Sequence, residues 1–185
     1  RLLKNSTLYV NLEPCNHYGK TPPCTEAIIK NNIKKVVIGS QDPNKLVNGS
    51  GIEKLRSGGC DVSVGIINQE CDELNKRFFT YHKLKRPFII LKWAESKDGF
   101  ISPIKSVKTL NKVNWISGED AKKLSHKWRS EEHSILVGVQ TIIDDDPILT
   151  TRFVKGRSPI RFVLDPNSRI PLDSRILSEA VQTTV

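Results

Sequence analysis

The sequence has no apolar run that approaches membrane-spanning length, no internal repeat and no low-complexity tract. These absences argue against a membrane-spanning, solenoid or disordered chain. Hydrophobic residues make up 37% and charged residues 26% of the 185 positions, which is typical of a soluble globular protein. The length allows one large domain or two small ones.

Cysteine is scarce, with residues at positions 15, 24, 60 and 71 only. Four cysteines could form two disulfides, but Cys60 and Cys71 fall in segments that read as a strand edge and an amphipathic helix. We therefore expect these two residues to be free thiols in the core. A cytoplasmic location follows from that expectation.

Acidic side chains are fewer than basic ones, 20 against 29, which gives a formal net charge of +9. The basic residues are scattered along the chain rather than clustered. This balance suits a phosphorylated small molecule or a nucleic acid, and it also suits a merely solvated surface. The charge alone does not choose among these readings.

The most informative stretch is EPCNHYGKTPPC, which places Cys15 and Cys24 on a loop stiffened by proline. The preceding TLYVNL predicts a buried strand and the following TEAIIKNN a short helix. Two fixed thiols make half of a zinc site, and amides at the helix start favour a thiolate at Cys24. The alternative is a pair of buried cysteines in a proline-rich turn.

The rest of the first half alternates strand and helix patterns. KKVVIGS and CDVSVGI read as strands around the helix GIEKLRSGG, and an amphipathic helix is predicted over residues 68–83. A loop written DPNKLVNGSGI separates the strand KKVVIGS from that helix; a loop of this length usually has a functional role, and a surface connection is the alternative. This order predicts a layered α/β domain.

A basic, proline-stopped turn at residues 85–87 predicts a linker, followed by the strand-like run PFIILKWA. Ser117 and Asp120 predict a capping box at the start of a helix that ends at Arg129. Arg129 suits either the helix dipole or a phosphate. The run of aspartates ending at Asp146 suggests a metal site or a helix stop, and we favour the stop.

The cysteine loop, with eight residues between its cysteines, closely resembles one branch of the zinc-dependent deaminases. That branch is the bifunctional riboflavin-biosynthesis family, diaminohydroxyphosphoribosylaminopyrimidine deaminase and 5-amino-6-(5-phosphoribosylamino)uracil reductase. The resemblance continues through LKWAESKDGFIS, the stretch from NWISGED to DDDPILTTR, and PIRFVLD. It implies an α/β chain in which a cytidine-deaminase-like three-layer domain (1–84) precedes a dihydrofolate-reductase-like α/β domain (87–185), both truncated.

The resemblance also implies zinc and NADPH as cofactors, a phosphorylated pyrimidine as substrate, and neither nucleic acid nor membrane as partner. Homo-oligomerisation is left open. The implied residues are Cys15 and Cys24 for metal; Lys92 near the reacting sugar; Ala94, Trp115, Thr141 and Asp145 for NADPH; and His17, Lys20, Arg129, Leu149 and Arg152 for substrate.

The chain departs from the family ahead of Cys15, where no His-x-Glu supplies a third ligand and the acid/base glutamate. We therefore expect an internal fragment that is inactive and marginally stable by itself. Two other hypotheses remain open: a nucleic-acid-editing zinc deaminase, although the usual Cys-x-x-Cys is lacking, and a non-catalytic zinc-binding fragment.

Overall fold

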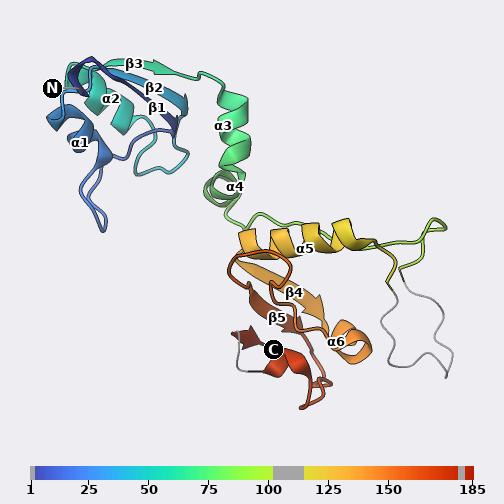
Figure 1. Cartoon of the computed structure of the whole chain (residues 1–185). Helices are drawn as coiled ribbons and strands as arrows, with labels where there is room; N and C mark the ends of the chain where they lie inside the picture. Colours follow the sequence, from blue (N-terminus) through green and yellow to red (C-terminus); the bar gives the residue numbers. More distant parts are fainter. Residues whose placement is uncertain (1–2, 102–114, 179–181) are drawn as a thin grey trace. The chain divides into compact units, whose positions relative to one another are not determined.

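The computed structural model describes residues 3–101, 115–178 and 182–185, and it divides into two compact units, Arg1–Ile90 and Leu91–Val185. Each unit contains a three-stranded parallel sheet (Figure 1). Because parallel strands cannot be joined by tight turns, the chain must cross over between them. The α/β class predicted from the alternating patterns is confirmed.

The first unit has the sheet order β1-β2-β3, with α1 and α2 in the two crossovers. Its elements are η1 (Leu3–Asn5), β1 (Thr7–Leu12), α1 (Cys24–Lys30), β2 (Lys35–Ser40), α2 (Ser50–Ser57), β3 (Asp61–Val64), α3 (Asn68–Leu74) and α4 (Lys76–Leu84).

Helices cover both faces of the central strand β2. On one face Val36 and Ile38 are fully buried against α1 and α2, with Leu55 of α2 at the centre of the cluster. On the other face Gly39 meets α3 so closely that a Cβ there would lie 2.1 Å from the sulfur of Cys71. The unit is therefore a helix–sheet–helix sandwich, the arrangement that parallel sheets require.

The single amphipathic helix predicted over residues 68–83 is wrong, because the structure has two helices that meet at Asn75. The side chain of Asn75 donates to the Cys71 carbonyl at 2.9 Å and so competes with helical hydrogen bonding. The break also changes the buried face: Phe79 is buried, whereas Leu74 and Tyr81 are exposed.

The second unit has the sheet order β4-β5-β6, with α6 in the first crossover. Its elements are α5 (Glu119–Glu131), β4 (Ser134–Gly138), α6 (Val139–Asp145), β5 (Ile160–Leu164), η3 (Arg175–Leu177) and β6 (Thr183–Thr184). As predicted, α6 ends within the aspartate run, with Asp146 in the left-handed conformation at φ 37°.

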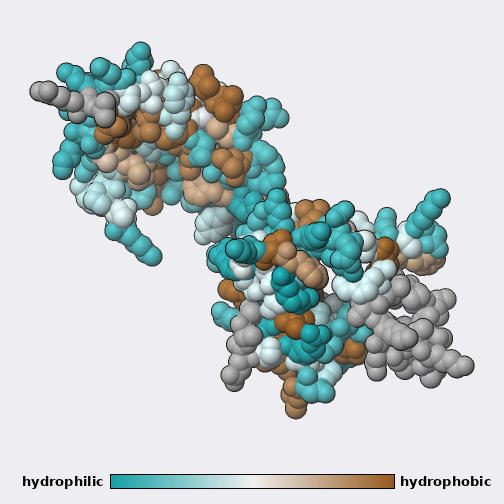
Figure 2. All heavy atoms as spheres, viewed as in Figure 1, coloured by the Kyte–Doolittle hydropathy of each residue, from teal (hydrophilic) through white to brown (hydrophobic). Residues whose placement is uncertain are grey.

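One face of this second sheet packs against Ile142 of α6 and Ile176 of η3. The other face is apolar but open to solvent: Leu136 pairs in register with Phe162, and Leu164 follows two residues later. Leu136 and Leu164 are 66% and 65% exposed. Figure 2 shows such apolar patches interrupting the hydrophilic surface of the molecule.

Two further predictions are wrong. Residues 87–94, written PFIILKWA, form no strand. A strand needs a neighbour for its backbone groups, and the described residues offer this segment none. Helix α5 begins at Glu119 with Gly118 as its N-cap and no capping side chain, so Ser117 does not form the expected box.

All four cysteines are free, and Cys60 and Cys71 are buried, as expected. The Cys60 thiol contacts the Ile33 carbonyl at 3.3 Å. Within the described ranges, no helix is both long and apolar enough to cross a membrane.

Candidate functional site

The two cysteines of the EPCNHYGKTPPC loop meet at the start of α1. Cys24 is the first residue of the helix, and its backbone N–H donates to the Cys15 sulfur at 3.3 Å. The hydrogen bond with the Cys15 thiol, followed by desolvation, raises the pKa of the Cys24 thiol. The backbone N–H at the helix start, which was expected to favour a thiolate at Cys24, contacts the Cys15 sulfur instead.

Two convergent thiols are a fitting pair of zinc ligands. In the described part of the chain, no third histidine, cysteine, aspartate or glutamate joins them to form a metal-binding group. The pair therefore fits half of a tetrahedral zinc site. His17 and Lys20, predicted to bind substrate, lie exposed on the same loop.

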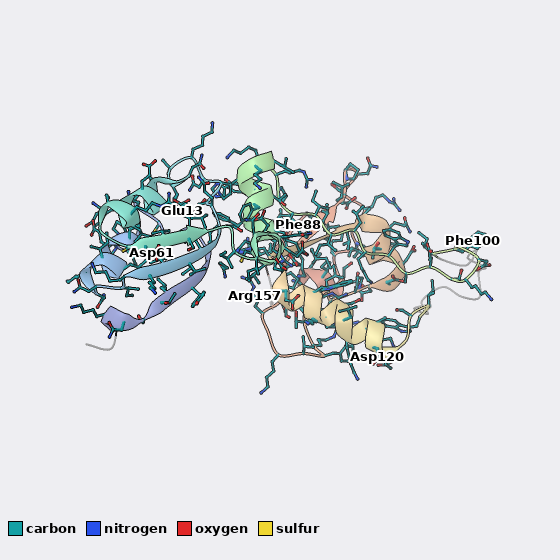
Figure 3. All side chains as sticks on the ribbon, turned by 90° about the horizontal axis from the view of Figure 1, so that it is seen from above. Glu13, Asp61, Phe88, Phe100, Asp120 and Arg157 are labelled. Atoms are coloured by element: carbon teal, nitrogen blue, oxygen red, sulfur yellow. The ribbon has the colours of Figure 1, made fainter. Side chains whose placement is uncertain are left out.

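Next to this pair lies a buried carboxylate that the sequence analysis missed. Glu13 follows β1 directly, is 3% exposed, and lies inside the first unit where Figure 3 labels it. One oxygen accepts the N–H groups of Asp42 at 3.1 Å and Gly49 at 3.0 Å. The other accepts those of Gly51 at 2.9 Å and Ile52 at 3.1 Å, in the first turn of α2.

A second set of contacts ties the cysteine loop to both helices of the same face. Thr25, fully buried, donates through its hydroxyl to Asn16 at 3.1 Å and through its backbone N–H to the Cys15 carbonyl at 3.3 Å. Asn16 in turn donates to the Ser50 carbonyl at the start of α2, at 3.4 Å. Residues on both sides of Cys15 are thus held.

In the second unit, the predicted substrate residues gather around a histidine that the sequence analysis missed. His126 of α5 is 4% exposed, and its Nδ1 accepts the backbone N–H of Arg152 at 3.0 Å. Its Nε2 lies 3.4 Å from Arg129, and its ring packs edge-on against Phe153. Arg129 also donates to the Thr150 carbonyl at 3.3 Å.

These contacts bring Arg129 and Arg152 together on one side of α5. Figure 3 shows Asp120 at the start of this helix and Arg157, from the loop that carries Arg152, beside its end. Desolvation, followed by the charges of Arg129 and Arg152, lowers the pKa of His126 from 6.5 to about 4. The imidazole is therefore neutral at physiological pH.

Lys92 belongs to the same electrostatic cluster. Desolvation, followed by the charge of Arg129, lowers the pKa of Lys92 below its ordinary value. A hollow of about 300 Å³ lies beside α5 and is lined by Lys92, Ala94 and Trp128, among others. The structure thus places the predicted reductase lysine, one predicted cofactor residue and the arginines along one helix.

Leu149 is buried in the apolar core of the second unit and has a strained backbone conformation. It is 5% exposed and has a φ of 58°, which side chains larger than glycine rarely adopt. The adjacent Ile148 carbonyl accepts from Arg161, a fully buried arginine of β5, at 3.0 Å. The turn at Leu149 thus directs the Ile148 carbonyl to Arg161, while the Thr150 carbonyl reaches Arg129.

The remaining predicted cofactor residues come from separate elements. Trp115 precedes α5, is 63% exposed and lies beneath the Lys122 ammonium, 4.1 Å from its ring centre. Thr141 and Asp145 are four residues apart on α6, so they share one helical face, and both are exposed.

Both units match known families. Residues 87–185 match the RibD C-terminal domain, and residues 1–40 match the zinc-binding region of cytidine and deoxycytidylate deaminases. The riboflavin biosynthesis protein RibD of Aquifex aeolicus (strain VF5) is 45% identical over 183 residues, which is 98% of this chain and 50% of that relative.

Solved structures agree. A diaminohydroxyphosphoribosylaminopyrimidine deaminase/5-amino-6-(5-phosphoribosylamino)uracil reductase from Thermotoga maritima is 39% identical with a TM-score of 0.84, covering 95% of this chain and 48% of that one. Acinetobacter baumannii RibD has the same TM-score, 0.84, at 35% identity, covering 96% and 51%.

The chain therefore spans about half the length of the relatives it matches. Its first unit is cytidine-deaminase-like and its second is the α/β domain of the RibD C-terminal family, which has a dihydrofolate-reductase-like fold. With a family match over more than half of its residues, the chain belongs to the RibD family of riboflavin biosynthesis proteins.

Proposed function

We propose that the gene product containing this chain deaminates a diaminopyrimidinone ribosylamine phosphate and then reduces its ribose to a ribityl chain with NADPH. Residues 1–84 contribute to the deaminase and residues 87–185 to the reductase. The observation that carries this proposal is the convergence of Cys15 and Cys24 at the start of α1.

In the deaminase half, the task of Cys15 and Cys24 is to hold zinc. When bound, zinc makes a coordinated water nucleophilic at neutral pH, which is the chemistry that replaces an amino group by an oxygen. His17 and Lys20, exposed on the loop between the cysteines, are proposed to bind the pyrimidine and its phosphate. The acid/base role belongs to a glutamate that we place outside this chain.

In the reductase half, Arg129 and Arg152 are proposed to bind the substrate phosphate, with Leu149 beneath the sugar. Arginine suits this task because its planar guanidinium donates two parallel hydrogen bonds to phosphate. The cluster also favours an anion, because desolvation and then the charge of Arg129 lower the pKa of Lys92, and desolvation and then the charge of Arg152 lower the pKa of Arg129. Lys92 is proposed to lie near the reacting sugar carbon.

NADPH supplies the hydride when it is bound, and the protein supplies orientation and charge. Ala94, Trp115, Thr141 and Asp145 are proposed to contact it. The hollow beside α5 supports this assignment for Ala94, which lines it. We also propose a cytoplasmic location, since all four cysteines are free thiols.

The test compares Cys15→Ser with Cys60→Ser in the gene product containing this chain. Cys15→Ser should abolish ammonia release from the ribotide and leave NADPH-dependent reduction of the deaminated substrate intact. Cys60→Ser should leave both activities unchanged, because serine can still donate to the Ile33 carbonyl. Full deamination with stoichiometric zinc in Cys15→Ser would refute the assignment of the loop.

A further inference from the structure

We propose that Glu13 is a positioning residue for the cysteine pair, since its carboxylate fixes the start of α2 and the packing of α2 fixes the backbone that carries Cys15. This inference rests on the proposed zinc site. It assigns a task to a residue that neither binds metal nor touches substrate.

The Glu13 carboxylate binds both ends of the segment that connects β2 to α2. Its four donors are the N–H of Asp42, just after β2, and those of Gly49, Gly51 and Ile52, where α2 begins. The N-cap of α2 is Gly49, which has no side chain to cap the helix. Glu13 performs that capping from 36 to 39 residues away.

The capped helix then packs directly on the peptide before Cys15. A Cβ on Gly51 would lie 2.0 Å from the Pro14 carbonyl oxygen, so only glycine allows the two backbones to approach this closely. Asn16, on the other side of Cys15, bonds to Ser50 of the same helix. A displacement of the start of α2 must therefore displace the residues that flank Cys15.

Charge is required as well as shape. Both carboxylate oxygens accept two N–H groups each, so a carboxamide would turn an NH₂ group toward two donors. Glu13→Gln is therefore a disruptive change, although glutamine has almost the same volume. Zinc binding responds to such a change because thiolate ligands must lie within a narrow range of distances and angles. Altering the residues that hold metal ligands usually lowers metal affinity by about 10- to 100-fold.

The experiment uses Co²⁺ as the probe, because thiolate-to-cobalt charge-transfer absorption reports the ligands without any assay of activity. The metal-free gene product containing this chain is titrated as wild type, Glu13→Gln, Asn16→Ala, Glu53→Gln and Leu55→Ala. Glu53 is an exposed carboxylate in the first turn of the same helix. Leu55→Ala destabilises the fully buried core of that helix without touching the loop.

We expect Glu13→Gln to weaken Co²⁺ binding by about 10- to 100-fold and to change the charge-transfer spectrum. Asn16→Ala, a milder change that removes the hydrogen bond to the Ser50 carbonyl, should shift the spectrum in the same direction. Glu53→Gln and Leu55→Ala should match the wild type. A wild-type spectrum in Glu13→Gln, or an equal change in Leu55→Ala, would overturn the positioning role. No thiolate absorption in the wild type would instead refute the proposed zinc site itself.

Discussion

The two units surround their charged side chains in opposite ways. In the first, the Glu13 carboxylate is surrounded by four backbone N–H groups. In the second, Arg129 and Arg152 both contact a neutral His126, and Lys92 lies near Arg129. No carboxylate within 3–101, 115–178 and 182–185 forms an ion pair with these three cations.

The difference shows which group of charges finds its partners within the protein. Backbone amides held by helix and strand are already oriented, so the first site is organised by the protein alone. In the second, desolvation followed by the charge of Arg152 lowers the pKa of Arg129, which means that its cationic form is disfavoured. An anionic ligand would remove that penalty, so under the proposed function phosphate binding should stabilise the second unit.

The largest effect expected from this contrast is on the stability of the first unit. Glu13→Ala leaves four buried N–H groups without their acceptor and should cost about 4 kcal/mol. Arg129→Ala should change the stability of the second unit by less than about 1 kcal/mol, because it also removes repulsion. Hydrogen exchange of peptides from α2 and from α5 would measure the two separately. A loss below about 1 kcal/mol in Glu13→Ala would contradict the contrast.

A somewhat smaller effect is expected on catalysis in the second unit. Arg129→Ala should weaken binding of the transition state by the reductase by roughly 2 to 4 kcal/mol, as measured from the fall in kcat/KM. Arg129→Lys should recover only part of that loss, because lysine cannot form the bidentate contact. Arg157→Ala, an exposed arginine on the same loop as Arg152, is the control and should be neutral. An efficiency within twofold of wild type in Arg129→Ala would make Arg129 a helix-end charge only.

Acid should destabilise the second unit through His126. Its folded pKa, about 4, lies below the ordinary value of 6.5, so the unfolded chain binds the proton more tightly. The stabilisation by neutral His126 is thus present above pH 6.5 and is lost as the pH falls toward 4. Between pH 7 and pH 5 the loss should be about 2 kcal/mol. Hydrogen exchange of α5 at the two pH values would measure it, and His126→Gln should abolish the difference between them. An equal pH effect in His126→Gln would exclude His126 as its source.

The smallest effect expected is stabilisation by inorganic phosphate. At ten times its dissociation constant, phosphate should raise the unfolding free energy of the second unit by about 1.4 kcal/mol and leave the first unit unchanged. Hydrogen exchange of the α5 and α2 peptides, measured with and without phosphate, would compare the stabilisation of the two units. Arg129→Ala should remove the effect, and equal stabilisation of both units would show a general salt effect instead.

Much of the fold could be predicted from the sequence, because burial repeats along the chain. The apolar runs that became β1, β2 and β4 alternate or persist as buried strands do. The wrong predictions concern segments whose secondary structure depends on contacts that the local pattern does not show. Residues 87–94 carry a strand pattern but have no neighbouring strand among the described residues, and Asn75 divides a continuous apolar period through its side chain.

The candidate site residues likewise fall into those that the sequence could predict and those that depend on distant partners. Cys15 and Cys24 could be predicted, because their loop carries proline stiffening and a family resemblance within a dozen residues. Glu13 and His126 could not. Their roles depend on N–H donors at least 26 residues away in sequence, and nothing local distinguishes them from surface residues. Only the spacing of His126 and Arg129, which is one helical turn, indicates from the sequence that their side chains are neighbours.

Cys15 and Cys24 are proposed as two of the zinc ligands, and X-ray absorption at the zinc edge is the direct test of that assignment. The zinc-loaded gene product containing this chain should show two sulfur neighbours at about 2.3 Å. Cys15→Ser and Cys24→Ser should each reduce that number to one or lose the metal, whereas Cys60→Ser should leave it at two. A zinc site without sulfur neighbours, or one that is unchanged in Cys15→Ser, would contradict the claim.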